Sequence, residues 1–366
     1  MNEKNISAPE KMADILNFGS VNLAMAIGYE LGIFDFMDEA DAPLSPAKLS
    51  EKTGLSERYL REWLPIMASA GVMALVVADE EKMDGNDDAY LLHKEWADIL
   101  TRRAGGNNMG EYAREIPLLT LLAKERVMEG FRTGKGVSYE HYGPFRDFMG
   151  ALAVNKHESV LVNVFLPSVD IGAMMEKLKK GISVMDLGCG DGTAAVLMAA
   201  AFPNSRFTGI DISEEMLAVG RGKAEKEGLG NIDFVLCDAG DPAMAERFNG
   251  CFDYVTAFDA IHDQTAPLQA LKNANAALKP GGVFSMIDIA AETSVVDNLN
   301  HSMGPFLYTV SLMHCMPVGL HDSGAGLGMM WGRQKAVTLL KEAGFTDVAI
   351  HAIPNDGFND HYLCRK

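Results

Sequence analysis

The second half of the chain alternates short apolar runs with longer segments in which apolar residues recur every three or four positions. Short runs rich in β-branched residues are typical of buried strands, and the longer period is typical of amphipathic helices. We therefore expect an α/β domain with a doubly wound parallel sheet over residues 181–366, interrupted by an insertion at about 292–332. The expected strands are 183–186, 206–211, 232–237, 252–258, 282–289, 347–351 and 361–365, and the expected helices are 192–201, 213–227, 242–248, 266–278 and 333–344.

The first 90 residues predict a small, mostly helical domain. A helix is expected over 17–33, and the turn Thr53-Gly54-Leu55 precedes a second helix at 57–70. A short strand at 72–77 and a polar, hairpin-like stretch at 79–88 follow. This order of elements is typical of a winged helix-turn-helix domain.

Residues 91–180 predict a helical linker between these two domains. Aromatic and methionine side chains gather in its middle, at Tyr142, Phe145 and Met149. Such side chains pack well against an organic molecule, and they also form ordinary helix cores. The sequence therefore leaves both a wall of a substrate pocket and a plain helix core open.

The charge of the chain argues against a polyanionic partner. Lys and Arg number 32 against 50 Asp and Glu, which gives a net charge of −18 that repels nucleic acid and anionic membranes. Between residues 11 and 80 there are five basic and eleven acidic residues. A DNA-reading helix needs a basic stripe, so packing or dimerisation is favoured over DNA binding for the winged helix.

The cysteines and the N-terminus indicate a cytoplasmic protein. Five cysteines, with no CxxC pair among them, predict neither a disulfide framework nor a metal site. The N-terminus does not have the pattern of a signal or transit peptide. A run of about 18 apolar residues, which a membrane span needs, is not found in the sequence.

A glycine-rich turn follows the first expected strand of the α/β domain. It has the sequence Leu187-Gly188-Cys189-Gly190-Asp191-Gly192-Thr193, and a helix follows it. A dinucleotide fingerprint would have a third glycine where Thr193 stands. The carboxylates of Asp186 and Asp191 would also repel a pyrophosphate. The turn therefore favours a ligand that carries an ammonium group over NAD.

Three more acids follow the ends of the next expected strands. Asp211 stands 21 residues after Gly190, close to the spacing at which an acid binds ribose hydroxyls. Asp238 follows the third strand and can accept a hydrogen bond from an adenine amino group. Asp259 follows the fourth strand. Since ligands bind at the carboxyl ends of such strands, we expect one shared cofactor site.

These segments together resemble the class I S-adenosylmethionine-dependent methyltransferases. The resemblance rests on 184–192, 209–213, 237–239 and 278–282, which stand in the order and at the spacing of that family. It implies a Rossmann-like seven-stranded sheet with an antiparallel last strand, and S-adenosyl-L-methionine as the cofactor. It also implies a cofactor site made of Asp186, Gly188, Cys189, Gly190, Asp211, Ile212, Met216, Asp238, Ala239, Phe258 and Asp259.

The whole chain is similar to small-molecule O-methyltransferases that carry an N-terminal winged helix, and this implies a homodimer. In that group a His-Asp pair after the fourth strand holds the catalytic base. His262-Asp263 resembles this pair, although Gln264 stands where a Trp is usual. Imidazole titrates near neutrality and suits a base. A second explanation, in which His262 only hydrogen-bonds the loop or the cofactor, stays open.

The insertion corresponds to the roof of the substrate pocket in the resembling group. Its candidate substrate residues are His301, Tyr308, His314, Cys315 and Trp331. The predicted function is methyl transfer to a small, largely apolar molecule at a hydroxyl oxygen, with a thiol or a nitrogen as the alternative nucleophile. A DNA-binding regulator that senses the cofactor and a noncatalytic scaffold are the hypotheses from other classes.

Overall fold

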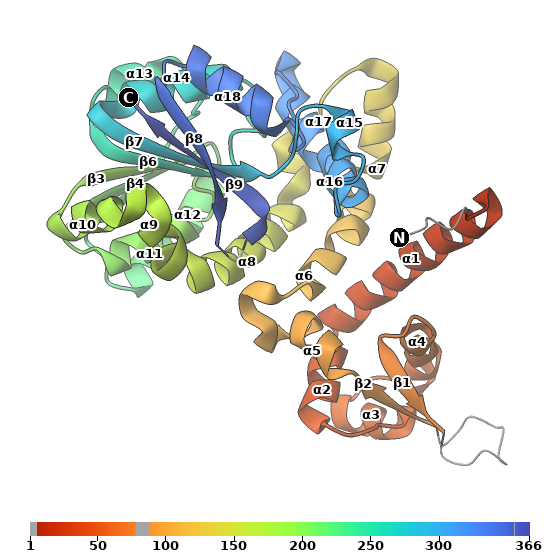
Figure 1. Ribbon diagram of the computed structural model, residues 1–366. Helices are drawn as coiled ribbons and strands as arrows, with labels where there is room; N and C mark the ends of the chain where they lie inside the picture. Colours follow the sequence, from red (N-terminus) through yellow and green to blue (C-terminus); the bar gives the residue numbers. More distant parts are fainter. Residues whose placement is uncertain (1–5, 78–87, 355) are drawn as a thin grey trace. The chain divides into compact units, whose positions relative to one another are not determined.

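The structure is a computed structural model that describes residues 6–77, 88–354 and 356–366 (Figure 1). The chain divides into two compact units, with the boundary between Leu118 and Leu119. The predicted division into three parts, at residues 90 and 180, stays a prediction.

The N-terminal unit is mostly helical. Its helices and strands are α1 (Ala8–Glu30), α2 (Ile33–Ala40), α3 (Pro46–Thr53), α4 (Glu57–Ser69), β1 (Met73–Val76), β2 (Ala89–Leu92), α5 (Lys94–Leu100), η1 (Arg102–Asn107) and α6 (Gly110–Ala113). Helix α7 (Glu115–Thr133) crosses the boundary. The first helix begins nine residues before the expected residue 17, because the Glu10 carboxylate accepts a 2.8 Å hydrogen bond from the backbone N–H of Ser7 and so caps an earlier start.

The order α3, α4, β1 and β2 confirms the winged-helix prediction. Ser45 caps α3 by accepting a hydrogen bond from Lys48 N at 3.4 Å, and Gly54 ends it at a φ of +73°. Strands β1 and β2 pair antiparallel, with Met73 opposite Leu92. The predicted polar stretch 79–88 lies, except for its last residue, outside the described residues.

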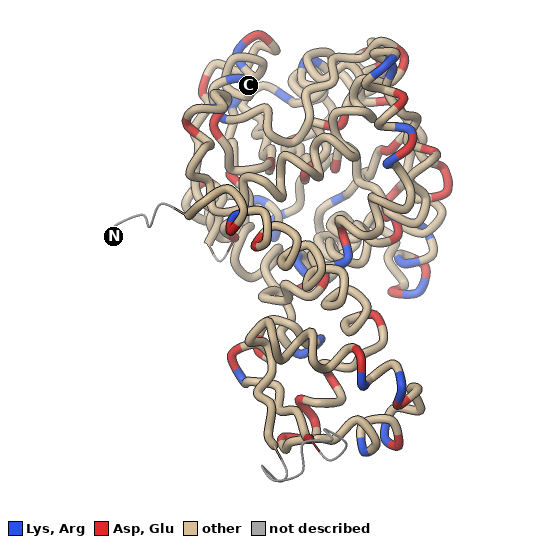
Figure 2. Tube along the Cα trace, turned by 90° about the vertical axis from the view of Figure 1, so that its right-hand side faces the viewer, with Lys and Arg blue, Asp and Glu red and all other residues tan. Residues whose placement is uncertain are grey.

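Helix α4, which would be the DNA-reading helix, has its basic residues in ion pairs of its own. Arg58 contacts Glu62 and Arg61 contacts Glu57, each at 2.5 Å. Acidic and basic positions are interspersed over this unit in Figure 2. The apolar side chains of α4 lie in the core of the unit, at Leu60, Trp63, Leu64 and Met67. The structure therefore gives α4 a packing role.

The second unit holds a seven-stranded sheet in the order β5-β4-β3-β6-β7-β9-β8. Only β9 runs antiparallel to its neighbours among these strands, which confirms the predicted fold. The strands are β3 (Ser183–Leu187), β4 (Arg206–Asp211), β5 (Ile232–Leu236), β6 (Phe252–Phe258), β7 (Leu278–Ile289), β8 (Asp347–Ile353) and β9 (Asp356–Arg365).

Helices cover both faces of this sheet (Figure 1). One core joins the sheet to α13 (Ala243–Phe248), α14 (Pro267–Ala277) and α18 (Gly332–Glu342). The other core joins it to η3 (Leu161–Phe165), α9 (Leu166–Ser168), α10 (Ala173–Lys180) and α11 (Thr193–Ala201). Helix α12 is Glu214–Lys226. The alternation of strands and helices thus produces the doubly wound arrangement that the sequence predicts.

The helical stretch from Tyr139 to Lys180 is long and apolar enough, by length and composition, to cross a membrane. One such stretch is weak evidence, since the core helix of a soluble protein passes the same test. Here the stretch is divided into η2 (Tyr139–Tyr142), α8 (Gly143–Val160), η3, α9, η4 (Val169–Gly172) and α10. Leu161 and Leu166 are buried in the core beneath the sheet. Packing against the sheet therefore explains part of its apolar character.

The predicted insertion lies between β7 and α18. It contains α15 (Val295–Asn298), α16 (Gly304–Val310), η5 (Ser311–Cys315), α17 (Met316–Leu320) and η6 (His321–Ser323). The segment η5 is a single π-helical turn. Such turns are rare and are frequent at functional sites.

We expect a methyl group at Gly28 of α1 to destabilise the N-terminal unit. A Cβ atom there would lie 2.2 Å from Cζ2 of Trp63, whose indole N–H is held by Ala24 O at 2.8 Å. Gly28→Ala should lower the free energy of unfolding by about 1–3 kcal/mol. Denaturant unfolding followed by tryptophan fluorescence measures this change.

Gly19→Ala is the matched control in the same helix, because a Cβ at Gly19 meets no atom within 4 Å. It should raise stability by up to about 1 kcal/mol, since alanine is the better helix former. Equal stability of the two variants would contradict the close packing of α1 against Trp63.

Candidate active site

The turn between β3 and α11 exposes its backbone. Gly190 has a φ of +54°, a conformation that favours glycine, and a Cβ there would meet no atom within 4 Å. The N–H of Gly190 donates to Asp211 Oδ2 at 2.9 Å. The turn therefore combines a fixed backbone with open space at its second glycine, which is what the close approach of a ligand requires.

Asp211 joins this turn to the end of β4. Its second carboxylate oxygen, Oδ1, accepts from the backbone N–H of Ser213 at 2.9 Å. Burial raises the pKa of this carboxyl, although the hydrogen bonds from Ser213 and Gly190 lower it. Each oxygen keeps a further lone pair for a ligand hydroxyl.

Asp186 is the most deeply buried acid of the turn. It lies at the fourth position of β3, is 3% exposed, and accepts a 2.7 Å hydrogen bond from Thr256 Oγ1 on β6. Burial raises its pKa to about 7, against the lowering effect of Thr256. A cationic ligand group beside it would favour its charged form.

The sequence predicted that Asp191 adds to the negative charge of the turn, and the structure does not bear this out. Its carboxylate accepts from Thr193 Oγ1 at 2.7 Å and forms an ion pair with Lys223 of α12. The same ammonium group donates to Thr193 Oγ1 at 2.6 Å. The charge of Asp191 is thus neutralised by Lys223, so the expected repulsion of a pyrophosphate rests on Asp186.

The other predicted cofactor residues lie at the same edge of the sheet. Ile212 and Asp238 are exposed, Cys189 is a half-buried thiol, and Met216 and Ala239 are buried. These places are compatible with the predicted adenine and ribose sides of a pocket, and the individual roles stay predictions.

Two predicted cofactor residues at the end of β6 already have partners. The Phe258 ring lies 4.9 Å from His157 and 5.8 Å from Phe165, measured between ring centroids. Asp259 has a φ of +48° and accepts a hydrogen bond from Asn359 Nδ2 of β9. The Asp259 carboxylate therefore links β6 to β9, in addition to any part in cofactor binding.

His262 lies between two carboxylates. Its Nδ1 is 2.8 Å from Asp288 Oδ1, and its Nε2 is 3.5 Å from Asp263 Oδ1. Asp288 Oδ1 also accepts from the indole N–H of Trp331 at 3.0 Å and from Ile289 N at 2.8 Å. Burial lowers the pKa of His262, but Asp288 and Asp263 together raise it well above its usual value of 6.5. The two carboxylates thus favour the charged form of the imidazole.

The predicted substrate residues His314 and Cys315 lie on the π turn η5 beside this group. Nδ1 of His314 is 3.5 Å from Cys315 Sγ and 3.9 Å from Asp263 Oδ2. The rings of Tyr142 and Phe145 stand 4.7 Å from the His314 ring. Reactive atoms of His262, Asp263 and Cys315 lie within 4.8 Å of one another. We call His262, Asp263, His314 and Cys315 the histidine cluster.

The remaining substrate candidates do not join this cluster through a contact seen in the structure. Nε2 of His301 contacts Ala290 O at 3.1 Å, and its Nδ1 accepts from Met303 N at 3.2 Å. Tyr308 accepts a hydrogen bond from Asn298 at 3.1 Å. Met149 is 37% exposed on α8, and Trp331 contacts the cluster only through Asp288. Their predicted contacts with a substrate stay predictions.

The cofactor turn and the histidine cluster are neighbours. A Cβ at Gly188 would lie 2.6 Å from Cβ of Ala260, two residues before His262. Burial raises the pKa of Tyr139, and the charges of both Asp211 and Asp263 raise it further. Tyr139 therefore lies within electrostatic reach of both groups.

Sequence reasoning missed Asp288, Lys223 and the position of Tyr139. The sequence could have indicated Asp288 as a site residue, because a single acid at the end of the apolar run of β7 needs a buried partner. Lys223 lies on the third turn of α12 and nothing in its neighbourhood along the chain points to Asp191.

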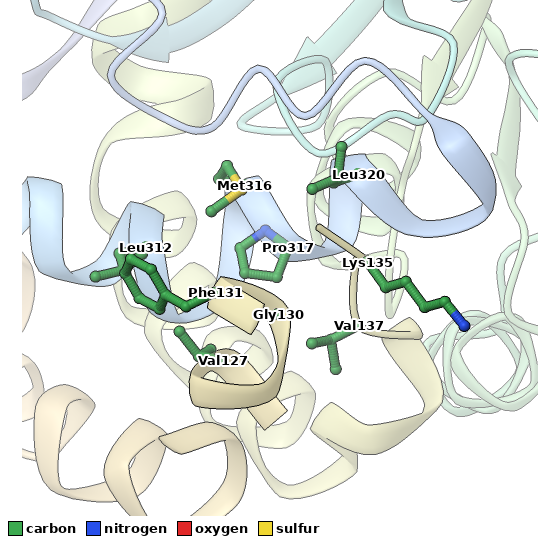
Figure 3. A pocket seen from close by; sticks show the side chains of 9 residues that line it. All are labelled: Val127, Gly130, Phe131, Lys135, Val137, Leu312, Met316, Pro317 and Leu320. Carbon is green, nitrogen blue, oxygen red and sulfur yellow. The ribbon is translucent and has the colours of Figure 1, made fainter. Parts of the chain in front are cut away.

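A shallow pocket of about 130 Å³ lies between α7 and the η5–α17 segment (Figure 3). It is lined by Val127, Gly130, Phe131, Lys135, Val137, Leu312, Met316, Pro317 and Leu320, and the Lys135 ammonium group extends away from it. A pocket for an organic ligand is usually about 300–1,000 Å³. This pocket is therefore too small to be the substrate site, and none of its lining residues belongs to the histidine cluster.

Residues 178–344 match the family model described as a methyltransferase domain, and residues 19–102 match that of an Rv2258c-like winged HTH domain. The chain carries a methyltransferase domain. The resemblance to methyltransferases is confirmed. For this class of domain, the predictions of an enzyme and of S-adenosylmethionine as its cofactor are also confirmed.

Relatives of this methyltransferase domain are found among bacterial enzymes. A demethylmenaquinone methyltransferase of Listeria welshimeri is 33% identical over 113 residues, which are 31% of this chain and 47% of the relative. One of Staphylococcus aureus strain JH9 is 27% identical over 186 residues, 48% of this chain and 72% of the relative. The chain thus spans about half the length of the Listeria relatives that it matches.

Solved structures resemble the entire chain. Human N-acetylserotonin methyltransferase in complex with SAM has a TM-score of 0.71 and 19% identity, over 100% of this chain and 99% of that one. A protein of Nostoc punctiforme described as an O-methyltransferase has a TM-score of 0.71 and 17% identity, over 98% and 99%. The mitomycin 7-O-methyltransferase MmcR has a TM-score of 0.66 and 18% identity, over 98% of each chain. Identities this low show a shared fold.

Proposed function

We propose that this chain is an S-adenosylmethionine-dependent methyltransferase that transfers a methyl group to a small, largely apolar molecule at a hydroxyl oxygen. The proposal rests on one observation, that a glycine turn and a histidine cluster are neighbours in the second unit. An acid-lined glycine turn borders open space at Gly190, and a histidine cluster beside it is enclosed by the rings of Tyr142 and Phe145.

The residues of the strand ends fit the proposed cofactor. Asp186 would face the cationic amino-acid end, Asp211 would accept from ribose hydroxyls, and the open backbone at Gly190 would lie against the cofactor. Asp238 and Ala239 would border the adenine. When bound, the cofactor supplies a methyl group on a positively charged sulfur, which an electron pair displaces in line. The part of the protein is to align the acceptor with that methyl group and to exclude water.

The enclosure of the histidine cluster supports an oxygen acceptor. A phenolic hydroxyl has a pKa of about 10, whereas a thiol of the cysteine type has one of about 8.5. An oxygen nucleophile therefore gains more from a base than a sulfur nucleophile does. A histidine of the cluster would take the proton, and the assignment of this base to His262, with Asp263 beside it, stays a prediction. Thiol and nitrogen acceptors remain the alternatives.

The proposed enzyme is a homodimer in the cytoplasm that binds neither nucleic acid nor membrane. Support for a dimer comes from α1, whose exposed apolar side chains include Met12, Ile15, Leu16, Phe18, Leu23 and Ile27. Exposed apolar side chains in this number on one helix are typical of a protein interface. The internal ion pairs of α4 speak against a DNA-binding regulator. All five cysteines are free thiols, as a reducing compartment would keep them.

Cofactor binding is the first test. Calorimetric titration with S-adenosylhomocysteine should give micromolar affinity, about −8 kcal/mol, and titration with NAD should give none. Asp211→Ala should weaken binding at least tenfold, because it removes an acceptor for ribose hydroxyls. Asp233→Ala is the control and should bind as wild type, because this exposed acid lies near the start of the neighbouring strand β5. Lack of binding to either ligand would favour the scaffold hypothesis.

The affinity for S-adenosylhomocysteine should fall in acid. The folded pKa of Asp186 is raised to about 7, so protonation below that pH removes the negative charge that faces the ammonium group. Between pH 8 and pH 5.5 the dissociation constant should rise about tenfold. Asp186→Asn should bind more weakly at pH 8 and should lose this dependence. A flat profile for wild type would remove Asp186 from the amino-acid side of the pocket.

The oligomeric state tests the role of α1. Light scattering with size-exclusion chromatography should give a dimer, and Phe18→Asp should give a monomer, because a charge would enter the apolar surface of α1. Phe18 is 73% exposed, so the fold of the unit should tolerate the change. Tyr59→Asp, on α4 and 80% exposed, is the control and should stay dimeric. A wild-type monomer would refute this surface as a dimer contact.

A further inference from the structure

His262 and His314 differ in the one property that a base needs, which is a free lone pair. We infer that Nε2 of His314 is the atom that accepts the proton of the acceptor hydroxyl, and that His262 is a positioning residue. This inference rests on the proposed function and assigns a residue within it.

Both ring nitrogens of His262 face carboxylates. Nδ1 lies 2.8 Å from Asp288 Oδ1 and Nε2 lies 3.5 Å from Asp263 Oδ1. A carboxylate only accepts hydrogen bonds, so each nitrogen is best placed to carry a proton. The ring is 3% exposed, which keeps water from competing with the two acids. The two carboxylates therefore favour the charged form of His262 over a ring with a free lone pair.

His314 is arranged in the opposite way. Its Nδ1 faces Asp263 Oδ2 at 3.9 Å and Cys315 Sγ at 3.5 Å, and the carboxylate favours a proton on that nitrogen. Its Nε2 is buried and has no hydrogen-bond partner in residues 6–77, 88–354 and 356–366. The neutral ring therefore presents a lone pair at Nε2. A buried polar atom without a partner costs free energy, so its presence points to a ligand that completes it.

The surroundings of the His314 ring suit an acceptor with an apolar ring. Tyr142 and Phe145 stand 4.7 Å from the imidazole, and Tyr139 stands 6.1 Å from it, all measured between ring centroids. Tyr142 is itself fixed, since its hydroxyl donates to Met313 O at 2.8 Å. The π turn that carries His314 widens the helix at this point.

The titratable groups that face His314 are Asp263, His262, the Cys315 thiol and the phenols of Tyr139 and Tyr142. Burial is the largest influence and lowers the pKa of His314, Asp263 raises it and His262 lowers it. Burial also raises the pKa of Cys315 to about 12 and those of both tyrosines, so these three stay neutral at pH 7. His314 is therefore neutral at the pH at which it must take a proton.

The proposed step balances. The acceptor O–H gives its proton to Nε2 of His314, and the oxygen electron pair forms the new bond to the methyl carbon. The electron pair of the broken carbon–sulfur bond stays on the sulfur, which becomes a neutral thioether. Asp263 compensates the charge of the protonated His314. The proton passes to water when the products leave.

Histidine NMR of the full chain, saturated with S-adenosylhomocysteine, tests the assignment without an acceptor. The chain has nine histidines, and His314→Gln and His262→Gln identify the two sets of ¹⁵N signals. At pH 7 His314 should be neutral with its proton on Nδ1, and it should titrate below 6.5. His262 should remain charged. A neutral His262 with a free Nε2, or a charged His314, would overturn the inference.

Kinetics supply the second test, with a panel of ring-hydroxylated aromatic compounds as probes. His314→Ala should lower kcat for an oxygen acceptor about 10²- to 10⁴-fold, and added imidazole should restore part of it. Its affinity for S-adenosylhomocysteine should be unchanged. His351→Ala, an exposed histidine on β8, is the control and should be as active as wild type.

The outcomes separate the inference from the proposed function. Full activity of His314→Ala, together with imidazole rescue of His262→Ala, would return the base to His262 and overturn the inference. A wild-type chain that neither binds S-adenosylhomocysteine nor methylates any probe would instead contradict the proposed function, and the NMR titration would still decide the protonation of the two rings.

Discussion

The site is built around one buried anion. Asp288 stands at the end of β7 with no exposed surface, and an isolated carboxylate there would cost several kcal/mol. Three groups contact the single oxygen Oδ1 of this carboxylate: the His262 ring, the indole N–H of Trp331 and the N–H of Ile289. These partners come from the loop after β6, from the end of the insertion and from β7 itself. Burying Asp288 therefore fixes the loop that carries His262 and Asp263, and ties the insertion to the sheet.

The other acids at the strand ends also need partners for their charges, and each has a different partner. Asp211 is satisfied by two backbone N–H groups, Asp191 by Lys223, and Asp259 by Asn359. Asp186 accepts a hydrogen bond from the hydroxyl of Thr256, which lowers its pKa, but burial outweighs this bond and raises the pKa to about 7. Asp186 stands at the glycine turn, and burial disfavours its charge there. A cationic ligand would compensate that charge.

Local signals in the sequence predicted the strands and the glycine turn because both depend on neighbouring residues. The bounds of β4 and β6 are as expected, and the turn at Gly188 to Gly192 lies directly after β3. The histidine cluster depends instead on contacts between distant segments. His262 and Asp288 are 26 residues apart, and Tyr142 meets the backbone of Met313 across 171 residues. Composition and periodicity do not encode such pairs, so the sequence named His314 and Cys315 as candidates without placing them beside Asp263.

Three buried histidines of the second unit differ in their surroundings, so residue type alone could not tell which of them is the catalytic base. His361 is buried and neutral, with a pKa lowered to about 3, but its Nε2 is engaged by Ser285 Oγ at 2.8 Å. His262 is equally buried, yet two carboxylates hold it as a cation. His314 is neutral like the first and lies beside Asp263 like the second, and its Nε2 has no partner in the described part of the chain. Asp263 lies 3.9 Å from Nδ1 and favours a proton there, the rings of Tyr142 and Phe145 stand 4.7 Å from the imidazole, and the buried Nε2 is the nitrogen left for the lone pair. Of these three rings, only His314 combines the properties that proton transfer from an apolar acceptor requires.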